Sequence, residues 1–336
     1  MNILVTGATG FIGSHTIVEL LNSNYSVIGI DNLVNSSEKV LERITELTNK
    51  QILFEQIDLR DKDKLSQFFE NNAINAVIHF AGFKAVGESV ENPLLYFSNN
   101  IKATITLLEV MAQFNVKELV FSSSCTVYGD PQDVPLTENS LLSPTNPYGR
   151  TKYWIEKMLL DIYDADSNWS IISLRYFNPI GAHPSGLIGE NPIGIPNNLV
   201  PFITQTVIGK RKKLSIFGDT YPTHDGTCVR DYIHVCDLSL GHVAALKKLK
   251  GFNKIDYYNL GTGKGHSVLD VVQTFERVNQ VKVPFEIDEK RPGDAAEVWA
   301  ETARAKEELK WEALLTLEDM LRDAWNWQVK NPEGIY

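Results

Sequence analysis

Short apolar runs alternate with helix-like segments along the first half of the chain. Residues 2–6 form the first run, and after a glycine-rich turn apolar positions recur at helical spacing from Ile12 to Leu21. Further apolar runs of strand length lie at 26–30, 51–57, 75–80, 116–123 and 169–176. Helix-like stretches lie at 36–47, 93–114 and 148–163. Strands this apolar, joined through helices, predict a parallel sheet that helices cover on both faces.

The texture of the sequence changes after Asn178. Gly and Pro are frequent from Pro179 to Pro201, and strands and helices no longer alternate regularly. We therefore predict an α/β protein with a doubly wound parallel sheet in residues 1–178 and a smaller mixed α/β domain in residues 179–336. The boundary is approximate, and the two parts can be interleaved.

Composition and charge narrow the class of protein. The 336 residues are 43% hydrophobic, which is ordinary for a packed core, and their net charge of -10 gives no basic surface for nucleic acid or an anionic membrane. The odd number of cysteines, without CxxC spacing, argues against a disulfide framework or a zinc site: Cys125, Cys228 and Cys236. No apolar run approaches the roughly 18 to 20 residues of a membrane span, and no signal-peptide pattern opens the chain. We expect a cytoplasmic protein without a metal site.

A dinucleotide site is the first candidate for function. The turn between the first strand and the first helix contains Gly7, Gly10 and Gly13. Glycines let the backbone approach a pyrophosphate, and the helix N-terminus offers free N–H groups, although a glycine turn without a ligand fits the same pattern. Asp31 ends the second strand, where its carboxylate can accept hydrogen bonds from ribose hydroxyls, and no Arg in 32–37 would bind a 2′-phosphate. The pattern favours NAD over NADP in a Rossmann-like domain, with Asp58 at the adenine or, alternatively, capping the next helix.

A serine-rich strand end and a Tyr/Lys pair form the second candidate. The strand ends in Ser122–Ser124, and Tyr148 and Lys152 follow at positions i and i+4 of a predicted helix, on one face. The lysine ammonium can stabilise a phenolate. Lowering a tyrosine pKa from about 10 to about 7 needs roughly 4 kcal/mol, and we expect Lys152 and the positive nicotinamide to supply it.

The same spacing occurs a second time, at Tyr153 and Lys157. Five residues rotate a helix by about 140°, so the two pairs cannot face one cofactor. Tyr148 follows Pro147 at the predicted helix start, near the strand ends where ligands bind in such sheets, and is therefore favoured. Tyr153 is expected in packing or in an interface.

The blocks around these residues make a resemblance specific. Over nearly its whole length the chain resembles the UDP-galactose (UDP-glucose) 4-epimerases of the extended short-chain dehydrogenase/reductase superfamily. The matching blocks are TGATGFIGSHT at 6–16, DNLVNS at 31–36, HFAGFKAVGESV at 79–90, SSSCTVYGD at 122–130, YGRTK at 148–152, RYFNPIGAHPSG at 175–186, IPNNLVPF at 195–202 and DGTCVRDYIHV at 225–235.

This resemblance implies an isomerase of UDP-hexoses that undergoes no net redox change. Tyr148 would take the proton of the sugar 4-hydroxyl while C4 passes a hydride to tightly held NAD. The 4-keto sugar would then turn its other face and receive the hydride back. Ser124 would hydrogen-bond the 4-oxygen, and Lys152 would hold the nicotinamide ribose and tune Tyr148. The family usually forms homodimers through the helix that bears the tyrosine, and we expect the helix at 93–114 to be its partner there.

The resemblance also assigns binding residues. The implied cofactor contacts are Gly7, Gly10, Phe11, Ile12, Gly13, Asp31, Asn32, Asn35, Ser36, Asp58, Leu59, Phe80, Ala81, Gly82, Lys84, Asn99, Tyr148, Lys152 and Phe177. The implied substrate contacts are Ser124, Asn178, Asn198, Leu199, Phe217, Arg230, Tyr232, Arg291, Asp294 and Val298. The two arginines match the family's diphosphate ligands, in the blocks VRDY and RPGD, and their planar forks suit that role. An isolated Arg is otherwise more often a solvated surface residue.

Val298 departs from the family pattern, because some members have a Tyr at this position. Loss of a phenol-sized group should open room beside C2 of the hexose, where an N-acetyl group would lie. We therefore expect activity on UDP-GlcNAc and UDP-GalNAc as well as on UDP-glucose and UDP-galactose. The alternative is that Val298 only fills the pocket differently.

The nearest alternative is a nucleotide-sugar 4,6-dehydratase, which shares the fold, the NAD and the Tyr/Lys pair. That reaction also needs carboxyl groups for acid/base chemistry beside the serine. Cys125 and Thr126 occupy these positions here and do not suit the elimination. Decarboxylating relatives are disfavoured because the glutamate they need there is missing.

A non-catalytic dinucleotide sensor is the alternative from another class. Such a protein would keep the glycine turn without needing a base. The joint presence of Ser124, Tyr148 and Lys152 argues against it.

Overall fold

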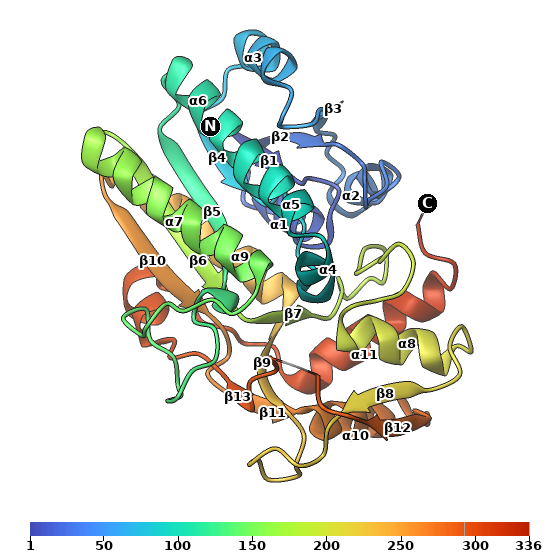
Figure 1. The fold of residues 1–336 in the computed structure, drawn as a ribbon. Coiled ribbons are helices and arrows are strands. Elements are labelled where there is room, and N and C mark those ends of the chain that lie inside the picture. Colours follow the sequence, from blue (N-terminus) through green and yellow to red (C-terminus); the bar gives the residue numbers. More distant parts are fainter. Residues whose placement is uncertain (292, 336) are drawn as a thin grey trace.

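A seven-stranded parallel sheet forms the larger part of the molecule (Figure 1). The computed structural model describes residues 1–291 and 293–335, so Pro292 of the RPGD block and Tyr336 lie outside the described residues. The strand order is β10-β6-β5-β4-β1-β2-β3. The strands are β1 (Asn2–Thr6), β2 (Ser26–Asp31), β3 (Leu53–Gln56), β4 (Ala76–His79), β5 (Glu118–Ser124), β6 (Ser170–Tyr176) and β10 (Ile255–Leu260). This is the Rossmann-like α/β fold that the sequence predicts.

Helices cover both faces of this sheet, which explains why its strands are apolar throughout. They are α1 (Phe11–Asn22), α2 (Val40–Thr48), α3 (Lys62–Asn71), α6 (Ala103–Gln113), α7 (Pro147–Ala165) and α9 (Val235–Leu249). On β1, Ile3 and Val5 belong to the core cluster with α1, α2 and α9. Leu4 belongs to the cluster with α3, α6 and α7. Successive residues of a strand point to opposite faces, so both faces need apolar side chains.

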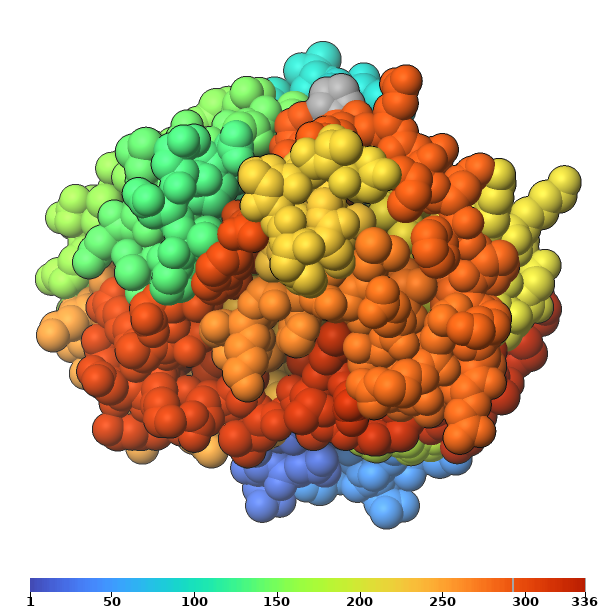
Figure 2. All heavy atoms as spheres, turned by 90° about the horizontal axis from the view of Figure 1, so that it is seen from below, coloured from blue at the N-terminus to red at the C-terminus, as the bar shows by residue number. Residues whose placement is uncertain are grey.

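Most of the C-terminal part of the chain lies beyond the carboxyl ends of the strands of the large sheet (Figure 1). Its strands are β7 (Asn178–Ile180), β8 (Leu214–Phe217), β9 (Val229–His234), β11 (Gly265–Ser267), β12 (Phe285–Asp288) and β13 (Glu297–Val298), and its helices are α8 (Leu199–Val207), α10 (Val268–Asn279) and α11 (Leu317–Lys330). Strands β7, β11 and β13 all pair with β9. Seen from below, residues coloured yellow to red cover most of the surface (Figure 2).

The two parts of the chain interleave. Strand β10 lies beyond residue 178 but pairs in parallel with β6 at the edge of the large sheet. Helix α9 also comes from this later segment, and it packs beside α1 in the core. None of the helices within the described residues is both long and apolar enough to cross a membrane.

The helix predicted at 93–114 is wrong as a single helix. The structure has α4 (Val86–Glu91), α5 (Pro93–Tyr96), the π-helical segment η1 (Phe97–Lys102) and then α6. Pro93 begins α5, because it lacks the N–H that would continue α4. The π-turn includes Asn100, whose buried side chain bonds the loop after β4. A wide turn of this kind is often found at functional sites.

Candidate active site

The glycine turn after β1 can be built only without side chains. Gly7 has φ +69°, and a Cβ there would lie 2.9 Å from the backbone nitrogen of Ala81. A Cβ on Gly13 would lie 2.1 Å from the carbonyl oxygen of Gly7. Gly10 precedes α1 without a side-chain cap, and the first turn of α1 contains no acidic residue. The N-terminal N–H groups of α1 are thus available to an anion, as a pyrophosphate requires.

Asp31 ends β2 beside this turn. Its carboxylate accepts hydrogen bonds from Thr9 N at 3.2 Å, Leu33 N at 2.9 Å and Ser36 Oγ at 3.3 Å. These bonds fix the carboxylate at the carboxyl edge of the sheet, where ligands bind in folds of this type. The side chain is therefore held where the sequence predicts a ribose ligand.

Asp58 lies next to the same region and does not cap the following helix. The cap of α3 is Asp61, which accepts from Lys64 N. Arg60 donates to Asp58 from Nε at 2.9 Å and from Nη2 at 2.6 Å, and these bonds lower the pKa of Asp58 to about 2. Asn32 Nδ2 lies 3.4 Å from the same carboxylate. The structure thus brings Asp58 and Asn32 together and removes the capping alternative.

Asn100 organises the loop after β4, and sequence reasoning missed it. Its Oδ1 accepts from Phe83 N at 2.8 Å, and its Nδ2 donates to Phe83 O at 3.0 Å and to Thr151 Oγ1 at 3.2 Å. The neighbouring Asn99, which was predicted as a cofactor contact, donates to Asn100 Oδ1 at 3.2 Å. Asn100 therefore ties the loop 80–84 to α7. An amide at an otherwise apolar helix position was the only signal that could have indicated it.

The Ser124 and Tyr148 side chains meet at the junction of β5 and α7. Tyr148 is the second residue of α7, whose N-cap Asn146 accepts from Gly149 N at 2.8 Å. Ser124 is the last residue of β5, and both side chains are buried. Burial raises the pKa of Tyr148 to about 12, against a hydrogen bond from Ser124 that lowers it.

Lys152 lies one turn further along α7 and is also buried. Its Nζ donates to the carbonyl oxygen of Ser122 at 2.7 Å. Burial lowers the pKa of Lys152 to about 8, with a smaller opposing contribution from Glu156. The three residues predicted as catalytic therefore lie on adjoining elements at one end of the sheet.

The sequence predicts that Lys152 and the positive nicotinamide together lower the pKa of Tyr148. The pKa of Tyr148 is raised, because burial penalises the phenolate. The Lys152 ammonium is directed to a backbone carbonyl. Lys152 does not offset the burial of Tyr148 by itself, so the predicted lowering of this pKa also depends on the positive nicotinamide.

A buried ion pair fixes α7 to the sheet behind these residues. Arg175 of β6 donates to Glu156 of α7 from Nε at 3.0 Å and from Nη2 at 2.7 Å. Ser123 Oγ donates to the same carboxylate at 2.5 Å. Nothing local in the sequence distinguishes Glu156 or Arg175 from solvated surface charges, so sequence reasoning missed this pair.

Tyr153 is the residue predicted to serve in packing or in an interface. It packs at the edge of a cluster that includes Val127 and Leu136. Lys157 Nζ lies 5.3 Å from its ring centroid. These contacts fit the packing role predicted for Tyr153, and the interface alternative stays open.

The C-terminal part brings several predicted substrate residues together. The Arg291 guanidinium lies 4.7 Å from the Phe217 ring centroid, and its Nε donates to Asp294 Oδ2 at 2.9 Å. Burial raises the pKa of Tyr232 to about 12, and the charges of Arg230 and Arg291 partly oppose this. Asn178 begins β7, Asn198 is the N-cap of α8 and Leu199 is its first residue.

Val298 is buried at the junction of the two parts. It pairs with Arg230 in the register of β13 and β9. It belongs to one apolar cluster with Phe177, and Cys125 packs against that cluster. Cys125 directly follows Ser124, so Val298 lies close to the end of the strand that bears the candidate serine.

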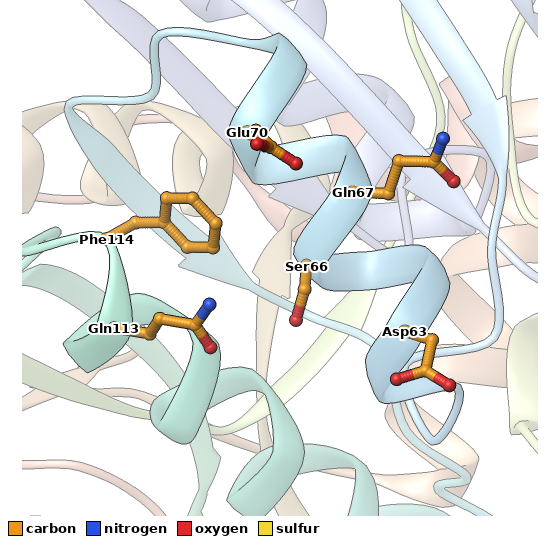
Figure 3. Close-up of a pocket in the computed structure, with 6 residues that line it drawn as sticks. All are labelled: Asp63, Ser66, Gln67, Glu70, Gln113 and Phe114. Carbon is orange, nitrogen blue, oxygen red and sulfur yellow. The ribbon is translucent and has the colours of Figure 1, made fainter.

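Two further features lie elsewhere. A groove of about 490 Å³ separates α3 from the end of α6, at the top of Figure 1, and Figure 3 shows its lining residues Asp63, Ser66, Gln67, Glu70, Gln113 and Phe114.

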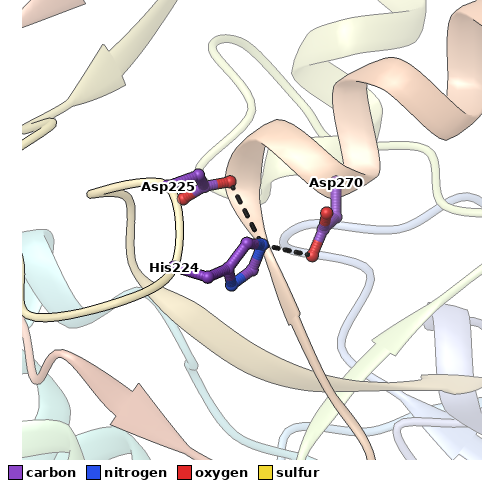
Figure 4. Close-up of side chains that lie close together, drawn as sticks. All are labelled: His224, Asp225 and Asp270. Carbon is purple, nitrogen blue, oxygen red and sulfur yellow. Dashed lines mark ion pairs between the residues drawn. The ribbon is translucent and has the colours of Figure 1, made fainter.

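His224 lies 3.6 Å from Asp225 and 3.3 Å from Asp270 (Figure 4). Both carboxylates already bond their surroundings, since Asp225 accepts from Thr227 N and Asp270 from Ser267 N in the capping box of α10. These contacts account for the group as an ion-pair cluster at the surface.

Comparisons with known proteins give a family model named for a dehydratase, and full-length relatives and solved structures that are 4-epimerases. A family model described as GDP-mannose 4,6 dehydratase matches residues 4–324. The chain is 54% identical to UDP-glucose 4-epimerase 2 of Arabidopsis thaliana, over 99% of this chain and 96% of the relative. It is also 54% identical to the UDP-glucose 4-epimerase of Bacillus subtilis (strain 168), over 99% and 98%. The solved UDP-glucose 4-epimerase from Bifidobacterium longum, in complex with NAD+ and UDP, has a TM-score of 0.96 and 48% identity and covers 100% of both chains.

Proposed function

Because the chain belongs to the UDP-glucose 4-epimerase family and is an NAD-dependent isomerase of UDP-glucose and UDP-galactose, we propose that Ser124, Tyr148 and Lys152 carry its reaction. The observation that supports this most is the buried phenol of Tyr148 within hydrogen-bonding reach of Ser124, with Lys152 one helical turn away. A buried acid and base beside a dinucleotide-binding turn suit transient oxidation of an alcohol.

The residues of the N-terminal part fit NAD. The first-turn N–H groups of α1 suit the pyrophosphate, Asp31 suits the adenosine ribose, and the region of Asp58 and Asn32 suits the adenine. NAD, when bound, supplies a hydride acceptor and a positive ring beside the sugar. The other cofactor residues implied by the resemblance, including Phe80, Lys84 and Asn99, are proposed on the same basis.

Tyr148 acts as the proton acceptor for the sugar 4-hydroxyl in this proposal. In the protein alone its pKa is about 12, so at neutral pH its oxygen carries a proton. A positive charge in the poorly solvated site favours the phenolate, and Lys152 adds to that charge once its ammonium turns from Ser122 O. Ser124 donates a hydrogen bond to the 4-oxygen of the sugar, whichever face of the sugar is turned to the cofactor.

The C-terminal part binds the UDP moiety in this proposal. Arg230 and Arg291 suit the diphosphate, because a guanidinium gives paired, charged hydrogen bonds. Phe217 beside Arg291 offers an aromatic surface for the nucleotide. Asn178, Asn198, Leu199, Tyr232 and Asp294 complete the proposed pocket, so residues 1–178 mainly hold NAD and residues 179–336 mainly hold the UDP-sugar.

We further propose that the sugar pocket accepts N-acetylhexosamines. Val298 is packed beside Cys125 and Phe177, where a tyrosine would place a much larger group. A valine takes up less space at this position than a tyrosine does.

A homodimer is also proposed. Large apolar side chains are exposed together on α4, α5 and α7, among them Val90, Leu94 and Trp154, with Leu94 79% exposed. The Trp154 ring packs against Phe97 of η1, 5.4 Å between centroids. An apolar surface over adjoining helices is typical of a protein–protein interface.

We also propose a cytoplasmic location, which the three free thiols support.

The dehydratase alternative is disfavoured by the side chains that follow Ser124. Burial raises the pKa of the Cys125 thiol to about 12, so Cys125 is a poor acid/base group near neutral pH. Thr126 donates its hydroxyl to Ser124 Oγ at 3.0 Å. Neither supplies the carboxyl group that elimination of the 6-hydroxyl requires.

Turnover of UDP-galactose tests the proposal, with Tyr148→Phe and Tyr153→Phe as a matched pair. We expect Tyr148→Phe to lower kcat by about 10²- to 10⁴-fold, the usual contribution of a positioned acid/base group, and to retain NAD. Tyr153→Phe should retain most of the activity. Equal activity of the two variants would refute the assignment, and a 4-keto-6-deoxy product would favour the dehydratase.

A further inference from the structure

One carboxylate oxygen joins the two parts of the molecule. Glu190 Oε1 accepts from Lys84 Nζ at 2.9 Å and from Asn198 Nδ2 at 2.6 Å. The Glu190 side chain is only 11% exposed. Lys84 belongs to the loop after β4, whereas Asn198 precedes α8 in the C-terminal part. The bridge therefore crosses from the proposed cofactor side to the proposed substrate side.

Each end of this bridge lies at a helix N-terminus. Lys84 Nζ lies 5.9 Å from the ring centroid of Phe11, the first residue of α1. Asn198 is the N-cap of α8, and its side chain makes no capping bond. Its amide is bound to Glu190 instead. Helix N-termini attract anions, so both ends of the bridge adjoin positions suited to phosphate groups.

The backbone of Glu190 is fastened to the C-terminal part. Trp327 Nε1 of α11 donates to Glu190 O at 3.2 Å. Gly189 packs so closely on the Trp327 ring that a Cβ would lie 2.4 Å from it. Asn331 Nδ2 donates to Gly186 O at 2.9 Å in the same segment. Glu190 thus reaches Lys84 from a backbone that is fixed to the C-terminal part.

The bridge also decides which atom Asn198 offers to a ligand. A carboxylate only accepts hydrogen bonds, so the group that faces Glu190 must be the amide Nδ2. Within the described residues Oδ1 of Asn198 has no hydrogen-bond partner, and it remains as an acceptor for a ligand N–H or O–H. A glutamine at position 190 can both accept and donate, so it would no longer select one orientation of the Asn198 amide.

We propose that Glu190 is a positioning residue that couples the binding of NAD to the binding of the UDP-sugar. This inference rests on the proposed roles of Lys84 and Asn198. A phosphate at α1 attracts Lys84, and a ligand at α8 orders Asn198. Both partners share one oxygen of a mostly buried carboxylate, so the position of each changes the hydrogen bonding of the other. Bound UDP should then slow the loss of NAD, and bound NAD should tighten UDP binding by the same factor.

The test measures the release of NAD from the holoenzyme with and without saturating UDP. For the wild type we expect UDP to slow the release by about tenfold, within the usual range of coupling between sites. For Glu190→Gln, which keeps the shape and removes the charge, and for Glu190→Ala, UDP should change the release by less than about twofold. Their KM for UDP-galactose should rise about tenfold, with kcat within about threefold of wild type.

Glu109→Gln is the matched control, because Glu109 forms an ion pair of similar length with Lys62, at 2.7 Å, on the exposed surface. It should behave as wild type. Equal slowing by UDP in wild type and Glu190→Gln, or no slowing in wild type, would overturn the inference. If Glu190→Ala does not fold, Glu190→Gln decides alone. Failure of the proposed function looks different, since calorimetry would then show no UDP binding to the wild-type holoenzyme.

Discussion

The ammonium group of Lys152 donates to the carbonyl oxygen of Ser122 at 2.7 Å, inside a region where both residues are buried. Burial lowers the pKa of Lys152 to about 8, because water no longer solvates its charge. A lysine in this setting destabilises the fold relative to an apolar residue of similar length. Such a cost is typical of residues that are kept for function.

Lys152→Met should therefore abolish activity and stabilise the NAD-free protein. The folded pKa is lowered, so the cost of charging Lys152 is absent above the unfolded pKa, near 10.5, and fully present below about pH 8. At pH 7 we expect the free energy of unfolding to rise by about 1–3 kcal/mol. Urea denaturation at pH 7 and at pH 10.5 measures this. A variant less stable than wild type at pH 7 would contradict the prediction.

Removing one partner of the ion pair between Glu156 and Arg175 should destabilise the fold, unlike the removal of Lys152. Both side chains are buried, with exposed fractions of 2% and 3%, so removing one partner leaves an uncompensated charge. Arg175→Met should lower the free energy of unfolding by about 3–5 kcal/mol. The exposed pair Arg277–Glu318 has the same N···O distance, 2.7 Å, and gives the control. Arg277→Met should cost less than about 1 kcal/mol. Similar losses in both variants would contradict this interpretation.

The sequence predicts the central sheet well because its signal is local. The run at Ile3, Leu4 and Val5 is apolar at every position, and a strand buried on both faces requires that. Helix α3 escaped prediction, since only Leu65, Phe68 and Phe69 are buried in an otherwise polar segment. The addition of β10 to the sheet could not be foreseen, because the choice of a strand partner depends on contacts distant in sequence.

In the candidate site, too, features with a local sequence signal could be predicted, and those that depend on distant contacts could not. Tyr148 and Lys152 are spaced by one helical turn, so their shared face follows from local geometry. Asn100 and Glu190 act through partners far along the chain, at Thr151 and Lys84, and no local spacing indicates such pairs. The raised pKa of Tyr148 also depends on burial, which the sequence does not give in detail.

The proposed dimer makes a prediction about the apolar surface on α4, α5 and α7. Leu94→Asp places a charge in the middle of this surface and should shift the protein from dimer to monomer in light scattering after gel filtration. Leu314 is comparably exposed, at 76%, but lies outside these helices, so Leu314→Asp is the matched control. A wild type that is already monomeric at micromolar concentration would refute the proposed dimer.

Val298 gives the sharpest prediction about substrate range. Val298→Tyr adds a ring to the buried cluster beside Cys125 and Phe177, on the side where an N-acetyl group is proposed to bind. A clash that only the larger sugar meets should lower kcat/KM for UDP-GalNAc by about 10- to 100-fold, while turnover of UDP-galactose stays within about threefold. Val298→Leu is the control for a modest gain in size. Its kcat/KM for UDP-GalNAc should lie between the values of wild type and Val298→Tyr. Side-by-side turnover of both sugars measures the ratio. Equal turnover of UDP-GalNAc by wild type and Val298→Tyr would show that the size of the side chain at position 298 does not control access of the N-acetyl group.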